Sequence, residues 1–201
     1  MYYSCVIPVL DYASSVWGYK KFQSIDNIQN RAIRYFFGVH RFAPLLAIYG
    51  DTGWIPSQYR RWINIIRYWN RVLSFECERI TRNVFEVDYN RCRNNWCSDL
   101  KDLLNFLELN YYFDSKITIE INFVRLKIHY FYSNFWGCEI LDIPKLRTFN
   151  SFKTFFGREN YVALDMCKYL RSILTQFRCG ILPLQIETGR YHGEPVEDRL
   201  C

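Results

Sequence analysis

Residues 57–75, SQYRRWINIIRYWNRVLSF, decide the fold. When each residue is given 100° of rotation, one broad helical face becomes apolar, made of Trp62, Ile65, Ile66, Trp69, Val72 and Leu73. A stripe about 60° wide on the opposite side consists of Arg60, Asn64, Arg67 and Arg71. The stretch therefore predicts a long amphipathic helix. Its row of guanidinium groups either is solvated or contacts a polyanion.

The composition predicts a folded chain. Of the 201 residues, 50% are hydrophobic and 19% are aromatic. Burying that much aromatic surface offsets the entropy lost when the chain becomes ordered, and disordered chains lack such a payload. The length is sufficient for one core or for two small helical subdomains.

The remaining periodicity is helical, so we expect an all-α fold of about seven helices. Apolar spacing predicts helices over 6–18, 25–37, 44–48, 99–109 and 161–177, with a turn at 50–53. Residues 117–135 fit both an alternating strand and a heptad helix, but only the heptad continues past Phe123. In the last predicted helix, the face that we expect to be buried comprises Val162, Met166, Leu170, Ile173, Leu174 and Phe177.

The charge of the chain favours a polyanionic partner, although an ordinary basic surface would have the same composition. The formal net charge is +6, and the 26 basic residues are 18 Arg and 8 Lys. Arginine binds phosphate bidentately and stacks on bases, which lysine cannot do. Besides the stripe on 57–75, basic side chains lie on the polar sides of two other predicted helices: Arg31 and Arg34, and Lys168, Arg171 and Arg178.

Residue patterns for catalysis or cofactor binding are absent from the sequence. There is no Asp-Asp pair, no glycine-rich phosphate loop and no Cys-x-x-Cys, and His40, His129 and His192 stand apart from one another. A lone histidine is usually structural. The eight cysteines are scattered, and the N-terminus has neither a basic signal region nor a long apolar run. We therefore expect an intracellular protein, nuclear or cytoplasmic, with reduced thiols, no membrane partner, no cofactor and no catalytic residue.

Several longer motifs resemble the region downstream of the catalytic palm in LINE-type (non-LTR) retrotransposon reverse transcriptases. They are PVLDYASSVWG (8–18), IDNIQNRAIRYFFGVHRFAP (25–44), AIYGDTGW (47–54) and RYWNRVLS (67–74). Two later stretches are similar to the same proteins: KLRTF with FK (145–153), and RSILTQFRCGILPLQIETGRYHGEPVEDRLC (171–201). Several long motifs in the right order are more specific than one short pattern.

The resemblance implies three consecutive parts. Residues 1–75 would form a thumb-like helical bundle, 76–140 a variable helical middle, and 141–201 a basic C-terminal segment that ends where a zinc knuckle begins. The palm with its Asp pair would precede Met1 and would be a partner of this region, which is itself non-catalytic. Cys201 would be at most one ligand of an incomplete zinc site, because zinc needs four donors. We therefore expect no bound metal.

The resemblance also implies the partner, which would be the backbone of RNA or of an RNA–DNA hybrid. Candidate phosphate contacts are Arg31, Arg34, Arg60, Arg67, Arg71, Lys168, Arg171, Arg178 and Arg190. Arg190 could instead pair with Glu187. Two alternatives remain open: a helical protein-interaction module, and a vestigial fragment without a selected activity. Phosphate binding and apolar docking differ in their response to salt.

Overall fold

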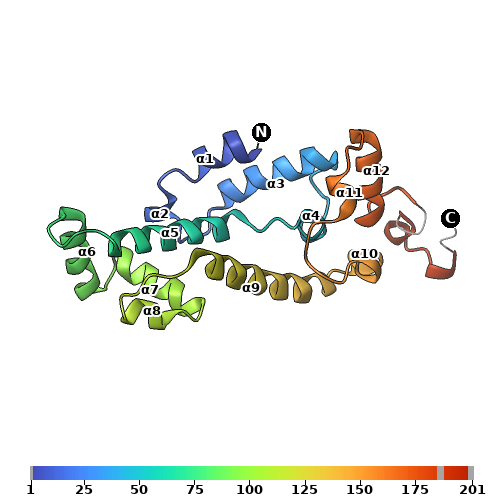
Figure 1. Ribbon diagram of the computed structural model, residues 1–201. Coiled ribbons are helices and arrows are strands. Elements are labelled where there is room, and N and C mark those ends of the chain that lie inside the picture. Colours follow the sequence, from blue (N-terminus) through green and yellow to red (C-terminus); the bar gives the residue numbers. More distant parts are fainter. Residues whose placement is uncertain (1, 185–187, 199–201) are drawn as a thin grey trace. The chain divides into compact units, whose positions relative to one another are not determined.

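The computed structural model describes residues 2–184 and 188–198, with only the backbone at residues 190, 191 and 196. The regular elements of these residues are twelve α-helices, α1 to α12, and four short 3-10 or π helices (Figure 1). The described residues form no strand. This confirms the prediction of an all-α fold.

The chain divides into two compact units, and each combines separate stretches of sequence. Unit 1 consists of Met1–Asn27 and Ile55–Phe131, and unit 2 of Ile28–Trp54 and Tyr132–Cys201. Two of the three boundaries between the units fall within helices α3 (Gln23–Phe37) and α9 (Ile121–Leu141), and the third lies between Trp54 and Ile55. Each of these two helices therefore contributes residues to both units.

Unit 1 begins with three short helical pieces: η1 (Tyr2–Val6), α1 (Ile7–Leu10) and α2 (Ser14–Trp17). The prediction of one helix over 6–18 is wrong at its centre. Ala13 adopts a left-handed conformation with φ of 51°, which interrupts the helical hydrogen bonds. Asp11 and Ser14 consequently lie at the break between α1 and α2.

Helix α5 (Ser57–Leu73) buries one face in the core of unit 1, as its sequence predicts. The buried residues of its apolar face are Trp62, Ile65, Ile66, Trp69 and Val72. The Trp69 ring stacks on Phe113 at a centroid distance of 5.6 Å, and its Nε1 donates to the carbonyl of Ile117 at 3.1 Å. The polar end of this buried indole is therefore satisfied.

The other helices of unit 1 are α6 (Ile80–Arg91), α7 (Trp96–Phe106), α8 (Asn110–Asp114) and the first part of α9. Helix α7 begins with a capping box, in which the Asn95 and Ser98 side chains each accept from the other's backbone N–H at 3.0 Å. The Asn70 side chain forms two hydrogen bonds with the backbone of Ile119, at 2.6 and 2.8 Å. These bonds attach the segment before α9 to α5.

Unit 2 contains the end of α3, α4 (Leu45–Thr52), the second part of α9, η2 (Pro144–Leu146), α10 (Arg147–Phe152), α11 (Asn160–Ala163), α12 (Lys168–Arg178), η3 (Gly189–His192) and η4 (Val196–Asp198). The predicted turn at 50–53 is wrong in part, because α4 continues to Thr52 and only Gly53 is left-handed, with φ of 66°. The buried Trp136 donates from Nε1 to the carbonyl of Leu46 at 2.8 Å. Of the two alternatives for residues 117–135, the helix is confirmed from Ile121 onward, where α9 begins.

The end of the chain differs from the predicted single helix over 161–177. Helix α11 ends at Ala163, and α12 begins only at Lys168 after an extended Leu164. The burial prediction for its apolar face is also wrong, because Leu170 is 54% exposed, Ile173 37% and Phe177 49%. Helix α12 is amphipathic, but its apolar face is not fully covered by unit 2.

Candidate nucleic-acid interface

The first half of the predicted arginine stripe on α5 is packed against the start of the chain. The Arg60 guanidinium forms an ion pair with Asp11, in which Nη2 also donates to Oδ1 at 3.3 Å. One turn later, Asn64 donates from Nδ2 to the Ser14 hydroxyl at 3.0 Å. Asp11 and Ser14 are therefore the hydrogen-bond partners of this half of the stripe.

The second half of the stripe is exposed. Arg67 donates from Nη1 to the Asn64 side chain at 3.1 Å, and Arg71 lies 5.8 Å from the centroid of the Phe75 ring. Arg79 lies over the same ring at 3.9 Å. No ion pair of the described residues involves these three arginines. Their charges remain available to a ligand.

Arg61 was not among the predicted candidates, and its side chain is fully buried. It donates to the Ser57 hydroxyl at 2.7 Å and to the carbonyl of Lys20 at 3.2 Å. Burial lowers the pKa of this guanidinium, and the nearby Asp26 carboxylate opposes that effect. Arg61 is a structural cation inside unit 1.

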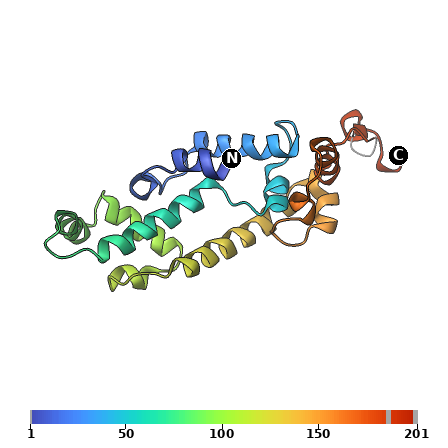
Figure 2. The same ribbon diagram turned by 45° about the horizontal axis from the view of Figure 1, so that its top comes forward.

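In unit 2, two basic residues of α12 lie on aromatic rings at the end of α3. The Lys168 ammonium is 4.0 Å from the centroid of the Tyr35 ring, and the Arg171 guanidinium is 4.3 Å from that of Phe36. Ser172 fixes this contact by donating to the carbonyl of Gly38 at 2.7 Å. Figures 1 and 2 show α12 beside the end of α3.

Two more predicted candidates lie on α3 itself. Arg31 is exposed and precedes Tyr35 by one helical turn. Arg34 points instead toward the following loop, where its Nη2 donates to the carbonyl of Ala43 at 3.3 Å, and burial lowers its pKa. We call the group Arg31, Tyr35, Phe36, Lys168 and Arg171 the α3–α12 surface.

The two segments that form the α3–α12 surface contain no acidic residue. Neither residues 27–50 nor residues 166–186 include Asp or Glu. Arg171 and Phe36 are 135 positions apart, yet the Arg171 guanidinium also donates to the Phe36 carbonyl at 3.4 Å. The fold therefore brings two basic, acid-free segments together beside exposed aromatic rings. The sequence did not predict the exposed Tyr35 as a site residue, nor the neighbouring Arg41 and Phe42. The Arg41 guanidinium lies 4.7 Å from the centroid of the Phe42 ring.

The charge of Arg178, another predicted phosphate contact, is neutralised by a carboxylate inside unit 2. Its Nε and Nη2 each donate to the buried Asp51 carboxylate at 2.7 Å, and Tyr161 donates to the same carboxylate at 2.7 Å. Burial alone would lower the pKa of Arg178, but the Asp51 hydrogen bonds and charge leave it raised. Nearby, the fully buried Lys153 side chain pairs with Glu159 and donates to the carbonyl of Gly157 at 2.7 Å.

Three features of the C-terminal end lie outside the described residues: Glu187, Cys201 and the side chain of Arg190. The part of the chain that the structure describes has no cluster of three or more His, Cys, Asp or Glu that could hold a metal ion. In the same part, no helix has the length and apolar character needed to cross a bilayer.

No family model, no curated protein and no solved structure matches the chain.

Proposed function

We propose that the chain binds the backbone of RNA or an RNA–DNA hybrid through the α3–α12 surface, as a non-catalytic part of a LINE-type reverse transcriptase. The observation that supports this most directly is the meeting of two acid-free basic segments, with Lys168 on Tyr35 and Arg171 on Phe36. The resemblance of several sequence motifs to the thumb and post-thumb region of those enzymes favours the same assignment.

The chemistry of the α3–α12 surface suits a nucleic-acid backbone. Arg31 and Lys168 are exposed cations on rigid helices, which can present charge to successive phosphates. Tyr35 is 76% exposed although Lys168 lies over its ring, so the ring can still stack on an unpaired base or contact a sugar. Contacts of this kind hold the ligand in place and are tolerant of sequence.

The proposed binding is tested by replacing two basic residues of the surface with glutamine, which removes their charge and keeps a polar side chain. The double variant Arg31→Gln, Lys168→Gln is compared with Arg91→Gln, Arg93→Gln, which removes the same charge from exposed positions of unit 1. Affinity for a fluorescently labelled RNA–DNA hybrid is measured by anisotropy over a series of salt concentrations. We expect the surface variant to lower the salt slope by about 2, because each lost phosphate contact removes roughly 0.9.

The control variant should change the affinity and the slope much less. Equal losses in the two variants would show that net charge alone drives binding, and the assignment to the α3–α12 surface would be wrong. Wild-type protein that does not bind the hybrid at low salt would overturn the proposed function itself.

A second candidate function is docking of a protein partner on α12, favoured by the exposure of Leu170, Ile173 and Phe177. Binding through that face would change little with salt, because it depends on apolar burial. It would be lost in Leu170→Ser, Phe177→Ser and retained in Arg31→Gln, Lys168→Gln. Binding of nucleic acid through the α3–α12 surface predicts the reverse pattern.

A further inference from the structure

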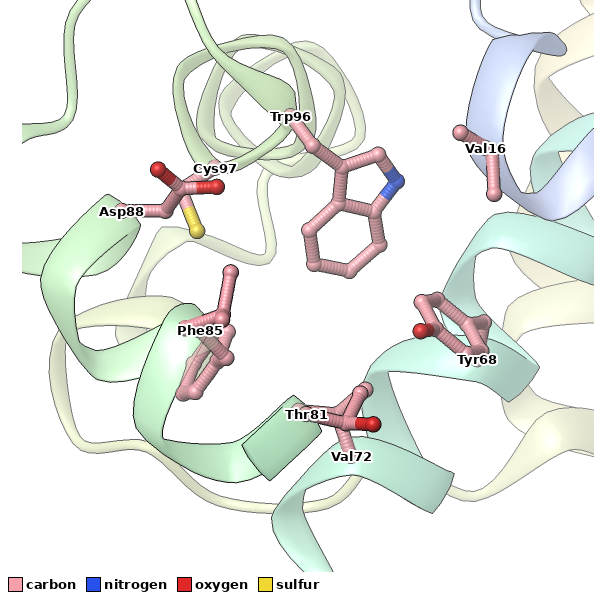
Figure 3. A pocket seen from close by; sticks show the side chains of 9 residues that line it. Val16, Tyr68, Val72, Thr81, Phe85, Asp88, Trp96 and Cys97 are labelled. Atoms are coloured by element: carbon pink, nitrogen blue, oxygen red, sulfur yellow. The ribbon is translucent and has the colours of Figure 1, made fainter. Parts of the chain in front are cut away.

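Unit 1 contains a pocket between α2, α5, α6 and α7, and none of the predicted phosphate contacts lines it. Its volume is about 170 Å³, and Figure 3 shows the side chains that surround it. A cavity of about 150 Å³ accommodates a benzene molecule. The pocket is therefore large enough for a compact group of five or six heavy atoms.

Aromatic rings form much of the wall. Trp96 and Tyr68 meet edge to face, with a centroid distance of 5.5 Å and an angle of 81°. The Trp96 Nε1 donates to the carbonyl of Ser15 at 2.9 Å, which fixes the orientation of the indole. Figure 3 shows Trp96, Tyr68 and Phe85 around the same space. Electron-rich ring faces of this kind attract cations.

Asp88 places a carboxylate at the same pocket, and that carboxylate has no ion pair or side-chain hydrogen bond among the described residues. Its neighbour Glu86, by contrast, is paired with Arg82 at 2.8 Å and Lys116 at 2.5 Å. The backbone carbonyl of Asp88 accepts from Cys92 N at 2.8 Å and from Asn95 Nδ2 at 2.7 Å, so the position of Asp88 is fixed.

Asp88 also lies in the last turn of α6, which ends at Arg91. The negative end of the helix dipole disfavours a carboxylate there and favours a cation beside it. The Asp88 charge also acts on Cys97, another residue of the pocket wall, where burial, and after it the Asp88 charge, raise the thiol pKa to about 12. The pocket therefore combines a negative potential with apolar walls.

We propose that this pocket binds an alkylated ammonium group, with the methyl groups against Trp96, Tyr68 and Val84 and the positive charge facing Asp88. Arg82, whose guanidinium lies 5.3 Å from the centroid of the Phe85 ring, donates to the carbonyl of Val72 at 3.2 Å and pairs with Glu86, so it does not neutralise Asp88. An external cation would complete the charge balance. A neutral ligand of the same shape would gain only the apolar contacts.

The probe is tetramethylammonium, compared with tert-butanol, which has the same number of heavy atoms and no charge. Both are titrated into the full chain at constant ionic strength, and the indole N–H resonance of Trp96 is followed by NMR. The resonance is assigned with Trp96→Phe. We expect saturable shifts with tetramethylammonium at concentrations at which tert-butanol has little effect.

The charge contribution is isolated by Asp88→Asn, with Asp102→Asn on the exposed side of α7 as the matched control. We expect Asp88→Asn to weaken tetramethylammonium binding by about tenfold, with Asp102→Asn close to wild type. Equal binding of the two probes, equal effects of the two variants, or no shift of Trp96 would overturn the proposal. If Asp88→Asn does not fold, the comparison of the two probes on the unaltered chain decides.

Choline and a short peptide containing trimethyllysine then distinguish a small molecule from a modified protein as the natural source. This pocket lies in unit 1 and the α3–α12 surface in unit 2, so either proposal can fail without the other.

Discussion

Glu86 illustrates how a single acidic residue is stabilised by two cations. Lys116 approaches its carboxylate at 2.5 Å from outside α6, and Arg82 at 2.8 Å from one turn earlier. The hydrogen bond from Lys116 is the largest influence, and with the charges of both cations it lowers the pKa of Glu86 despite partial burial. A carboxyl group with a lowered pKa in the folded state stabilises the protein above its unfolded-state pKa.

Glu86→Gln should therefore be destabilising at neutral pH and nearly neutral in acid. At pH 6 we expect a loss of less than about 1 kcal/mol, because water screens partly exposed ion pairs. The difference should begin to shrink as the pH falls below about 4, where the unfolded-state carboxyl takes up its proton, and it should disappear as the pH falls through the lowered pKa of the folded state. Urea unfolding at pH 6 and pH 3 measures it, with the exposed Glu76→Gln as the control. A difference that grows in acid would contradict this account.

The predicted site residues differ in whether an acidic side chain pairs with them. The sequence alone does not specify these pairs. Arg60 and Arg67 lie on one stripe of α5, but Asp11 pairs with the first and only Asn64 contacts the second. Arg178 shares the polar side of α12 with Lys168, but Asp51, 127 positions away, accepts both of its hydrogen bonds. Helical periodicity predicts which side of a helix is polar. Which basic residues remain unpaired depends on long-range packing.

At the scale of helices, α4 and α9 show why two helical glycines are not equivalent. A Cβ built on Gly50 would lie 2.5 Å from Cζ2 of the buried Trp136. A Cβ on Gly137, in α9, would meet nothing within 4 Å. Gly50 permits a close approach of α4 to α9, whereas Gly137 only weakens its helix.

Alanine at these two positions should therefore have opposite effects. Gly50→Ala is expected to destabilise unit 2 by about 1–3 kcal/mol, the usual cost of overpacking. Gly137→Ala should stabilise the protein by up to about 1 kcal/mol, because alanine has the higher helix propensity. Chemical denaturation followed by circular dichroism compares them. Stabilisation by both substitutions would show that Trp136 can move away from α4.

Long amphipathic helices were predictable, and short or partly covered ones were less so. The apolar face of α5 matches its prediction because a strong 3.6-residue period leaves one face to bury. The break at Ala13 has no periodic signal, since it results from a single left-handed residue. In α12 the period is correct, but the exposure of Leu170 and Phe177 depends on whether another element covers them.

At the scale of the whole molecule, the cysteines report on both units. Cys5, Cys77, Cys138 and Cys167 are exposed, whereas Cys97 in unit 1 and Cys179 in unit 2 are buried. Burial is the largest influence on both buried thiols and raises the pKa of each to about 12. Only the thiolate reacts with alkylating reagents.

Brief treatment with iodoacetamide at pH 8 should therefore modify Cys5, Cys77, Cys138 and Cys167 and leave Cys97 and Cys179 unmodified. Peptide mass spectrometry locates the labels, and labelling in urea is the positive control for both buried thiols. Rapid native labelling of Cys97 alone would show that unit 1 opens readily, and labelling of Cys179 alone would show the same for unit 2.

Lys153 has a consequence for how the chain can vary in length. Its buried ammonium bonds to the Gly157 carbonyl and the Glu159 carboxylate. Residues 153–159 therefore close a small ring that contains a desolvated charge. Inserting or deleting one residue there would move the anionic end of the ring away and leave the ammonium without compensation. We therefore expect insertions and deletions to destabilise the fold between 153 and 159, and to be tolerated better in exposed stretches such as 74–79.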